Sequence, residues 1–566
     1  MSRIQGKNIP YLLLAAAVLA LTGIFGLSGC AFKSAGPSEP LHLTILHTND
    51  THANWGGHSK DGRICYEALC EEGSGGILRA DQAIRAIRAP QTGSTGSQKP
   101  ATLLLGAGDQ FQGTLFYTLH KEAMAAEVVN SLGYDAFVPG NHEFDDGCEG
   151  FASFVRALKT PVLAANLAFT PEGPAPPVSL APWLITKRQG HRIGLVGLVN
   201  PDTPNLSSPC KEARFSAVEP ALQKALAELQ AQQVNIIIVM THLGLADDRE
   251  LARKFDGIDI IVGSHTHSLL SNSHAKALGP YPVVETSPAG KPVLVVTNGY
   301  ALKNLGRLEV VFDEQGVAQS WNGEPIPLND AELANLQAPP ANAELAAMMH
   351  NRAVPVQNML TEPVGNIVAD TPAGQPLERP NVLICRAGEC RSGNLVSDAL
   401  LHYWQGAADI ALVGGGTLRN PLPAGPVSTG DIIAAIPFEN NLMLAEMDGV
   451  TLLAALEQGL SRYEEGKGFF LQVAGLRYSF KAENPRGSRL LSASVLGADK
   501  TWQPVQPQAR YRVSTSSFQA RGGDGFTMLA GLNWRDSEQN ISDVVREYIS
   551  TRSPVEVQLE GRIIKK

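Results

Sequence analysis

The sequence predicts an α/β protein with two domains and a helical linker between them. In residues 41–313, short runs of leucine and β-branched residues alternate with helical stretches. A polar region with several prolines, residues 322–340, interrupts this alternation, and an alanine-rich helical stretch, residues 341–358, follows it. A second α/β pattern occupies residues 364–549. The 566 residues of the chain are enough for two hydrophobic cores.

The individual elements follow from apolar runs bounded by glycine and from the helical stretches between them. Strands are expected at 44–46, 103–105, 137–138, 192–198, 236–239, 260–262 and 293–297. Helices are expected at 80–88, 121–132, 150–158, 220–232, 394–404 and 450–460. We therefore place the first domain at residues 41–335, the linker at 336–363 and the second domain at 364–552.

The N-terminus has two basic residues, an uncharged stretch over residues 11–27, and then Leu-Ser-Gly-Cys ending at Cys30. The run is a little short for a spanning helix, which needs about 20 apolar residues. It resembles a bacterial lipoprotein signal, with residues 1–29 as the signal peptide and Cys30 as the lipidated residue. Ala31, directly after this cysteine, resembles the residue type found there in lipoproteins sorted to the outer membrane. Residues 30–40 are expected to be a flexible tether. An ordinary signal peptide or an uncleaved anchor is the alternative.

Six cysteines remain besides Cys30 among the seven of the chain. An even number in an exported protein predicts disulfides. Two pairs enclose only four residues, a loop short enough for the distance that a disulfide requires, and the third pair follows by elimination. A zinc site is the alternative, but the CxxC-like spacing and companion ligands that it requires are missing. The expected pairs are Cys65–Cys70, Cys148–Cys210 and Cys385–Cys390.

The net charge of -9 argues against a nucleic-acid polymer as partner, because phosphate backbones require basic patches. Any anionic substrate must therefore be held by local charge.

Five of the apolar runs end in residue types that bind metals. Because residues just past the carboxyl ends of strands gather at one rim of a sheet, we expect these side chains to lie together. The set is Asp50, His52, Asp109, Asn141, His142, His242, His265 and His267.

These fragments resemble, in order and spacing, the calcineurin-like metallophosphoesterases. The fragments are Asp50-Thr51-His52, Gly108-Asp109, Gly140-Asn141-His142-Glu143, Thr241-His242 and Gly263-Ser264-His265-Thr266-His267. The resemblance implies a layered β-sandwich domain flanked by helices and a site for two divalent metal ions. It implies that Asp109 bridges the ions, that Asp50, His52 and His267 complete one site, and that Asn141, His242 and His265 complete the other. Nitrogen and oxygen ligands suit zinc, manganese or cobalt without choosing among them.

His142 is not a ligand in this assignment. In the family it approaches the scissile phosphate and pairs with an aspartate, matched here by Asp145. A protonated imidazole could stabilise the transition state or protonate the leaving oxygen. The alternative is that Asp145 only caps the helix expected near residue 150.

Motifs in the second domain extend the resemblance to the 5'-nucleotidase and UDP-sugar hydrolase family. They are Cys385-Arg386, Ser392-Gly393-Asn394-Leu395, Gly414-Gly415-Gly416, Pro437-Phe438-Glu439-Asn440 and Phe518 with Arg521-Gly522-Gly523-Asp524-Gly525-Phe526. The resemblance implies that Phe438 and Phe518 sandwich the nucleobase, that Asp524 accepts from the ribose, and that Arg386 meets phosphate. It also implies substrate contacts for Arg419 and Asn440. Core packing is the alternative for the two phenylalanines.

Two positions depart from the family pattern. Val413 stands before the glycine triplet, where many relatives have an asparagine that contacts the base. Arg419 follows the triplet after two residues instead of one.

The resemblance implies an exported, lipid-anchored hydrolase that releases phosphate from nucleoside 5'-monophosphates, with UDP-sugars or NAD as further substrates. One alternative is a 2',3'-cyclic-nucleotide phosphodiesterase with 3'-nucleotidase activity. A second is a non-catalytic nucleotide-binding surface lipoprotein, which should have lost ligands.

Overall fold

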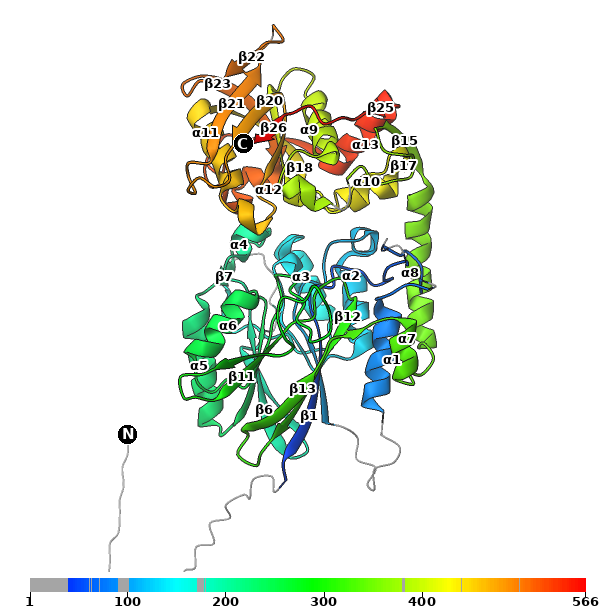
Figure 1. The fold of residues 1–566 in the computed structure, drawn as a ribbon, viewed down its shortest axis with the longest axis vertical. Helices are drawn as coiled ribbons and strands as arrows, with labels where there is room; N and C mark the ends of the chain where they lie inside the picture. Colours follow the sequence, from blue (N-terminus) through cyan, green and yellow to red (C-terminus); the bar gives the residue numbers. More distant parts are fainter. Residues whose placement is uncertain are drawn as a thin grey trace, which may run out of the picture.

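The computed structural model describes residues 39–566 apart from 61, 63, 71, 90–100, 171–177, 179, 379–381, 439 and 498. The predicted signal peptide, Cys30 and most of the tether lie outside the described residues. Two domains are stacked along the long axis of the molecule, and the helix α8 (Ala343–Thr361) runs along one side of the first domain and reaches the second (Figure 1). Within the described residues, no helix has the length and apolarity that crossing a membrane requires.

The first domain contains two six-stranded sheets. One has β1 at its centre, parallel to β2 and antiparallel to β12. Its strands, in order, are β13 (Ala318–Gly323), β12 (Asn304–Phe312), β1 (Leu41–Thr48), β2 (Ala101–Gly106) and β3 (Ala136–Phe137), with β14 (Ile326–Pro327) paired to β12. The other is parallel through β11, β9, β8 and β6. Its order is β10 (Val283–Thr286), β11 (Pro292–Val296), β9 (Ile260–Val262), β8 (Ile236–Thr241), β6 (His191–Leu198) and β5 (Trp183–Arg188).

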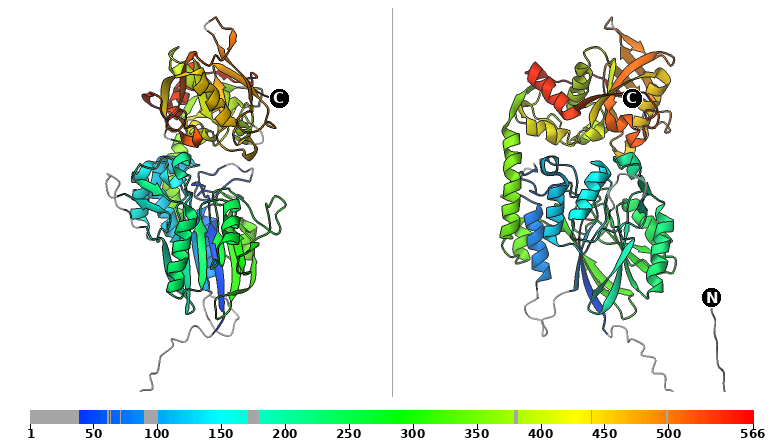
Figure 2. Two further views of the ribbon diagram at one scale, coloured as in Figure 1. Left: turned by 90° about the vertical axis from the view of Figure 1, so that its left-hand side faces the viewer. Right: turned by 180° about the vertical axis from the view of Figure 1, so that it is seen from behind.

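The two sheets form the middle layers of a sandwich, with helices outside each of them (Figure 2). Helices α1, α2 and α3 lie on one side and α5 and α6 on the other. Their bounds are α1 (Ile77–Arg88), α2 (Leu115–Leu132), α3 (Gly147–Ala157), α5 (Val218–Ala231) and α6 (Leu245–Lys254). Smaller elements are η1 (His142–Phe144), β4 (Leu167–Phe169), α4 (Thr203–Leu206), β7 (Ala213–Phe215) and α7 (Asp330–Asn335). The predicted strands and helices of this domain are present, and the layered sandwich is confirmed.

The expectation of a single sheet rim was wrong. The strands that end at the predicted ligands belong to both sheets, since β1, β2 and β3 lie in one and β8 and β9 in the other. An apolar run shows that a strand is buried but not which strand it pairs with, so sequence patterns do not separate one sheet from two. The side chains come together because the corresponding edges of two packed sheets lie side by side.

Helix α8 begins with Asn342 as its N-cap, whose side chain accepts from the backbone amides of Glu344 and Leu345. Its buried residues Leu345, Met349, Ala353 and Val356 belong to the hydrophobic core of the first domain. Beyond its end, the carbonyl of Glu362 accepts from the amide of Thr429 in the second domain. The connecting helix is therefore packed on the first domain along its length and contacts the second at its end.

The second domain is built around a five-stranded sheet that separates two cores. Along its strand β16, Ala411 and Val413 face one core while Ile410 and Leu412 face the other. The sheet runs β19 (Leu471–Ala474), β16 (Ile410–Gly414), β23 (Arg510–Ser516), β18 (Asn441–Asp448) and β24 (Arg535–Asn540). A three-stranded sheet has the order β17 (Gly425–Ser428), β15 (Pro363–Val368) and β25 (Val555–Glu556). A four-stranded sheet has the order β22 (Trp502–Pro504), β21 (Leu490–Leu496), β20 (Leu476–Phe480) and β26 (Ile563–Lys565).

The helices of this domain are α9 (Arg391–Tyr403), α10 (Thr429–Ala435), α11 (Gly449–Leu460), α12 (Ser517–Ala520) and α13 (Ile541–Arg552), with short turns η2 (Val382–Arg386), η3 (Gly415–Thr417), η4 (Tyr463–Glu465) and η5 (Gly523–Gly525). The helices predicted at 394–404 and 450–460 correspond to α9 and α11. Residues beyond 552 contribute β25 and β26 to the sheets. The three predicted disulfides are formed, with Cα atoms 5.9, 5.4 and 5.1 Å apart in Cys65–Cys70, Cys148–Cys210 and Cys385–Cys390.

Candidate metal centre and substrate cavity

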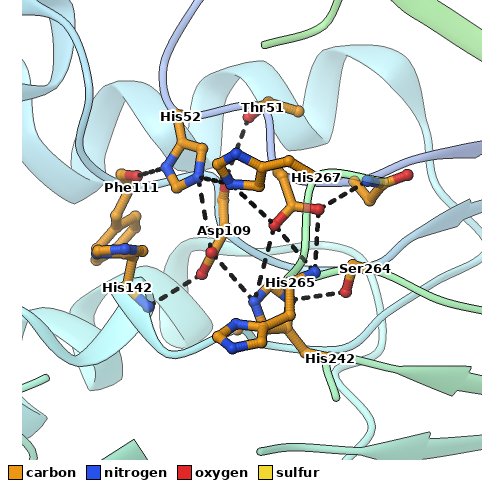
Figure 3. A network of polar contacts seen from close by, with 12 residues as sticks. Thr51, His52, Asp109, Phe111, His142, His242, Ser264, His265 and His267 are labelled. Atoms are coloured by element: carbon orange, nitrogen blue, oxygen red, sulfur yellow. Dashed lines mark hydrogen bonds and ion pairs between the residues drawn. The ribbon is translucent and has the colours of Figure 1, made fainter. Parts of the chain in front are cut away.

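The predicted metal ligands converge in one cluster, and Figure 3 shows His52, Asp109, His242, His265 and His267 side by side. Asp109 is central, because its carboxylate lies 3.1 Å from His242 Nε2 and 3.7 Å from His52 Nε2. Asp50 is 3.6 Å from His267 Nε2 and 3.9 Å from His242 Nε2. Three groups each bring three possible ligand atoms within 4.8 Å of one another: Asp50 with His52 and His267, Asp109 with His242 and His265, and Asp109 with His52 and His142. The first two groups agree with the ligand sets that the resemblance implied, and the third joins them through Asp109 and adds His142.

The backbone turns sharply where these residues leave their strands. Five of the predicted ligands adopt the left-handed conformation, at φ 48° for Asp50, 45° for His52, 55° for Asp109, 75° for His265 and 54° for His267. Such a conformation costs roughly 1–3 kcal/mol for a residue other than glycine and persists only where the surrounding structure imposes it. The fold of this domain therefore holds the ligand side chains in one arrangement at the expense of its own stability.

Two glycines allow the ligand loops to approach closely. A Cβ atom on Gly140 would lie 2.2 Å from an Asp109 carboxylate oxygen, and one on Gly108 would lie 2.5 Å from the Gly140 amide nitrogen. Both distances are shorter than any tolerable contact. The Gly108-Asp109 and Gly140-Asn141 motifs therefore require glycine so that the loops after β2 and β3 can touch.

Neighbouring groups orient the ligand side chains. His242 Nδ1 lies 2.9 Å from the carbonyl of Ala107 and 2.8 Å from the hydroxyl of Ser264, which leaves Nε2 directed at Asp109. The Asp50 carboxylate accepts from Asn49 Nδ2 at 2.7 Å and from the amide of His265 at 3.1 Å. Such contacts set the tautomer and direction of metal ligands.

A buried acceptor without a partner indicates that the site fits a cation. Asn141 Oδ1 has no hydrogen-bond partner within the described part of the chain. Leaving a buried polar atom unpaired costs about 1–3 kcal/mol, so such atoms are rare without a ligand. In addition, His52 Nε2 and His267 Nε2 lie 3.0 Å apart, as two nitrogens bonded to one ion at about 2.1 Å can.

Electrostatics keep most of these imidazoles neutral. Burial lowers the pKa of His52 to about 3 and holds the pKa values of His265 and His267 well below their usual range. Burial also opposes charge on His242, but the Asp109 carboxylate outweighs it and raises the pKa of His242 to about 10. The proton on His242 Nε2 is stabilised by the negative charge of Asp109. A metal ion bound at Nε2 would replace this proton.

Glu143 is a residue whose role sequence reasoning missed. It is fully buried, and its carboxylate accepts from the backbone amides of Asp109 at 2.9 Å, Gln110 at 2.6 Å, Phe111 at 3.3 Å and Gly140 at 2.5 Å. It thereby ties the Asp109 loop to the Asn141 loop. The only signal in the sequence was the place of Glu143 in the Gly140-to-Glu143 motif, which does not indicate its hydrogen-bond partners.

His142 stands at the cavity side of the metal centre. Its amide donates to Asp109 Oδ1 at 3.0 Å, and its Nδ1 lies 2.6 Å from Asp145 Oδ2. The other Asp145 oxygen accepts from the hydroxyl of Ser207 at 2.6 Å. Burial opposes charge on His142, but the Asp145 and Asp109 carboxylates raise its pKa above the usual value. Helix α3 has Asp146 at its N-cap, so the helix-capping alternative for Asp145 was wrong.

A cavity of about 1280 Å³ separates the metal centre from the second domain. This exceeds the roughly 300–1,000 Å³ of common ligand pockets. All predicted substrate-binding residues line it, together with Asp109, Asn141, His142, His265 and His267 from the first domain. Those of the second domain are Arg386, Arg419, Phe438, Asn440, Phe518 and Asp524. The structure therefore brings the predicted residues of both domains to one space.

Arg419 connects the two walls of this cavity. One guanidinium nitrogen lies 3.3 Å from His142 Nε2, and the guanidinium carbon lies 4.9 Å above the Phe438 ring. The Phe438 ring itself is stacked near His142, with centroids 6.3 Å apart. The extra residue between the glycine triplet and Arg419 therefore does not keep this arginine out of the site.

The guanidinium groups are poorly satisfied by the protein itself. The Nε atoms of Arg386 and Arg419 are buried with no partner among the described residues. Burial and the neighbouring Arg419 lower the pKa of Arg386 to about 10, so it stays charged at pH 7. Burial raises the pKa of Asp524 to about 7, against the influence of both arginines. Val413, in contrast, is buried in the second domain's core and does not line the cavity.

Comparison with known proteins agrees with this architecture. Residues 43–269 match a family model described as calcineurin-like phosphoesterase, and residues 365–531 match one described as 5'-nucleotidase, C-terminal domain. The 5'-nucleotidase of Diplobatis ommata is 34% identical over 561 residues, which cover 94% of this chain and 92% of that protein. The 5'-nucleotidase of Homo sapiens is 32% identical, with 97% and 92% covered.

The solved structure of a 5'-nucleotidase precursor from Thermus thermophilus is 34% identical and superposes with a TM-score of 0.79. The match covers 93% of this chain and 99% of that chain. Both domains and their order are therefore shared along nearly the full length. The chain belongs to the 5'-nucleotidase family, as a phosphohydrolase with a calcineurin-like metallophosphoesterase domain followed by a 5'-nucleotidase C-terminal domain.

Proposed function

We propose that this protein releases phosphate from nucleoside 5'-monophosphates with the help of two divalent metal ions. The observation that carries the proposal is the cavity, which has the Asp109 cluster on one wall and Arg386, Arg419 and Phe438 on the other. A nucleotide has the same division, with an anionic phosphate at one end and a flat base at the other. The cavity offers a partner to each end.

The Asp50, His52 and His267 group would hold one ion. His242 and His265, with the unpaired Asn141 Oδ1, would hold the other, and Asp109 would serve both. Two such ions supply an activated water and neutralise charge on the phosphoryl oxygens. The ligand chemistry accepts zinc, manganese or cobalt.

His142 and the arginines perform the remaining steps in this proposal. His142 donates its Nε2 proton to the leaving ribose oxygen, while Asp145 holds the opposite ring nitrogen. Arg386 and Arg419 bind phosphate oxygens, for which guanidinium groups offer paired donors. Phe438 and Phe518 stack on the base, and Asp524 and Asn440 contact the sugar and base side. Because stacking tolerates any base, several nucleotides are accepted.

The proposal includes export and a lipid anchor at Cys30 on the outer membrane. Three disulfides within the described residues support an oxidising compartment, since cytosolic reductants keep most cysteines reduced. Labelling of the cells with a radioactive fatty acid, with Cys30→Ala as the unlabelled control, tests the anchor.

The experiment for the activity is a substrate panel with released phosphate as the readout. Purified protein is treated with EDTA, then supplied with zinc, manganese or cobalt, and assayed on AMP, UMP, 3'-AMP, 2',3'-cyclic AMP, UDP-glucose and NAD. We expect AMP and UMP to be hydrolysed in a metal-dependent manner. Preference for 2',3'-cyclic AMP and 3'-AMP would replace the proposal with the cyclic phosphodiesterase. Binding of AMP without hydrolysis under every metal would support a non-catalytic nucleotide-binding protein.

A further inference from the structure

Lys467 lies in the turn between η4 and β19 of the second domain and lines the cavity. Its side chain is half-buried, and its ammonium has no ion-pair or hydrogen-bond partner in the part of the chain that the structure describes. Arg462, the residue just before η4, differs because Glu465 binds it at 2.9 Å and its guanidinium covers the Phe469 ring. The turn therefore presents one neutralised cation and one unpaired cation to the cavity.

The position of Lys467 is imposed by close backbone packing. The amide of Gly416 donates to the carbonyl of Gly468 at 3.0 Å, and the amide of Gly415 donates to the carbonyl of Phe470 at 2.7 Å. A Cβ atom on Gly468 would lie 2.8 Å from Gly416 Cα, so only glycine fits there. The turn that carries Lys467 is thus held against the glycine triplet that precedes Arg419.

Lys467 shares its cavity with Arg386 and Arg419 of the same domain and with Asp109 and His265 of the metal centre. A Cβ atom on the next residue, Gly468, would lie 3.6 Å from an Asp524 carboxylate oxygen, so the turn also borders Asp524. The turn therefore places a third cation on the cavity wall that carries the two arginines.

We propose that Lys467 is a third cationic contact of the substrate phosphoryl group, on the same cavity wall as Arg386 and Arg419. This inference rests on the proposed function, because it concerns the same phosphate. An ammonium is a compact point charge with three donors, and it suits an oxygen that the planar guanidinium groups leave unbound. An unpaired cation lining a partly buried cavity is stabilised when an anion enters.

The test compares Lys467→Ala, Lys467→Gln and Lys467→Arg with the wild type. Lys481→Ala is the matched control, because Lys481 is an exposed lysine of the same domain outside the cavity. The measurements are kcat/KM for AMP and the inhibition constants of inorganic phosphate and of adenosine, with metal content and thermal unfolding determined for each variant.

We expect Lys467→Ala and Lys467→Gln to lower kcat/KM by about 10- to 100-fold, as loss of a charged hydrogen bond does. The inhibition constant of phosphate should rise with it, adenosine inhibition should stay the same, and Lys467→Arg should recover part of the loss. Unchanged phosphate inhibition in both neutral variants overturns the inference. An equal weakening of adenosine and phosphate also overturns it, because that indicates a structural role.

Failure of the proposed function has a different signature. If the wild type hydrolyses no nucleotide, calorimetric titration of the metal-loaded protein with inorganic phosphate still tests Lys467. A lower phosphate affinity in Lys467→Ala than in Lys481→Ala then supports the contact, and equal affinities refute it.

Discussion

The two walls of the cavity are built in different ways. On the first-domain wall five predicted ligands have a strained backbone, and the single carboxylate of Glu143 accepts from four amides of their loops. On the second-domain wall Arg386, Phe518 and Asp524 are half-buried, and the Nε atoms of Arg386 and Arg419 have no partner among the described residues. The side chains of the first wall are thus held by contacts within the protein. The guanidinium groups of the second wall keep donors that a bound substrate can use. Changes on the first wall should therefore affect metal binding and kcat, and changes on the second should affect substrate binding.

The largest effect should come from Asp109→Asn, which removes the charge shared by both groups of ligands. We expect metal content to fall and kcat/KM to drop by roughly 10³-fold or more, because charge stabilisation by metals is worth several kcal/mol. Elemental analysis and AMP assays measure this. Asp543→Asn, an exposed aspartate on α13, is the control. Full metal content with near-normal activity would contradict a bridging role.

His142→Ala should have the next largest effect and should separate chemistry from metal binding on the first wall. We expect kcat to fall by about 10²- to 10⁴-fold, the usual contribution of a general acid, with metal content retained. Single-turnover measurements on AMP at saturating metal test this. Loss of metal in parallel with activity would show that His142 serves the ligands instead.

Glu143→Gln tests whether the metal centre depends on its preorganised loops. One oxygen of the carboxylate is replaced by a donor facing backbone donors, so we expect about 10- to 100-fold weaker metal binding, as for other groups that orient ligands. Titration of the metal-free protein with zinc or manganese gives the affinity. Unaltered affinity would mean that the strained loops hold without this carboxylate.

Phe518→Ala tests the second wall alone. Stacking of a base on an aromatic ring contributes about 1–3 kcal/mol, so the KM for AMP should rise while metal content and phosphate inhibition stay unchanged. The ring packs on the backbone of Gly523, where a Cβ atom would lie 2.5 Å away, so the variant leaves that glycine without its neighbour. A thermal unfolding curve therefore accompanies the kinetics. Equal KM values for Phe518→Ala and the wild type would show that Phe518 only packs within the second domain.

The smallest effect is expected in the pH dependence of Asp145→Asn. The Asp145 carboxylate raises the pKa of His142, and the protonated form is the acid in the proposed reaction. Activity should therefore fall as pH rises through this pKa, and in the variant the fall should begin at lower pH. Profiles of kcat against pH for the two proteins measure the shift. A shift in the opposite direction would exclude His142 as the acid.

Much of the site was predictable because metal chemistry restricts residue types. The fragments around Asp50, Asp109, Asn141 and His265 predicted a cluster of candidate ligands and their place after buried strands, and the structure brings these side chains together. The disulfide pairs followed from an even count and two short loops. Glu143 and Lys467 were not predicted, since a glutamate that binds amides and a lysine in a turn have no distinctive spacing.

The sequence by itself determined the order of α/β elements, the donor types of the metal centre and the division into two domains. Tertiary structure alone decided that the candidate ligands meet across two sheets, that Arg419 reaches His142, and that Lys467 lines the same cavity as the candidate metal centre. The physical reason is that periodicity along the chain encodes which face of an element is buried. Strand pairing and the docking of one domain on another depend on contacts between residues hundreds of positions apart, which local patterns do not record.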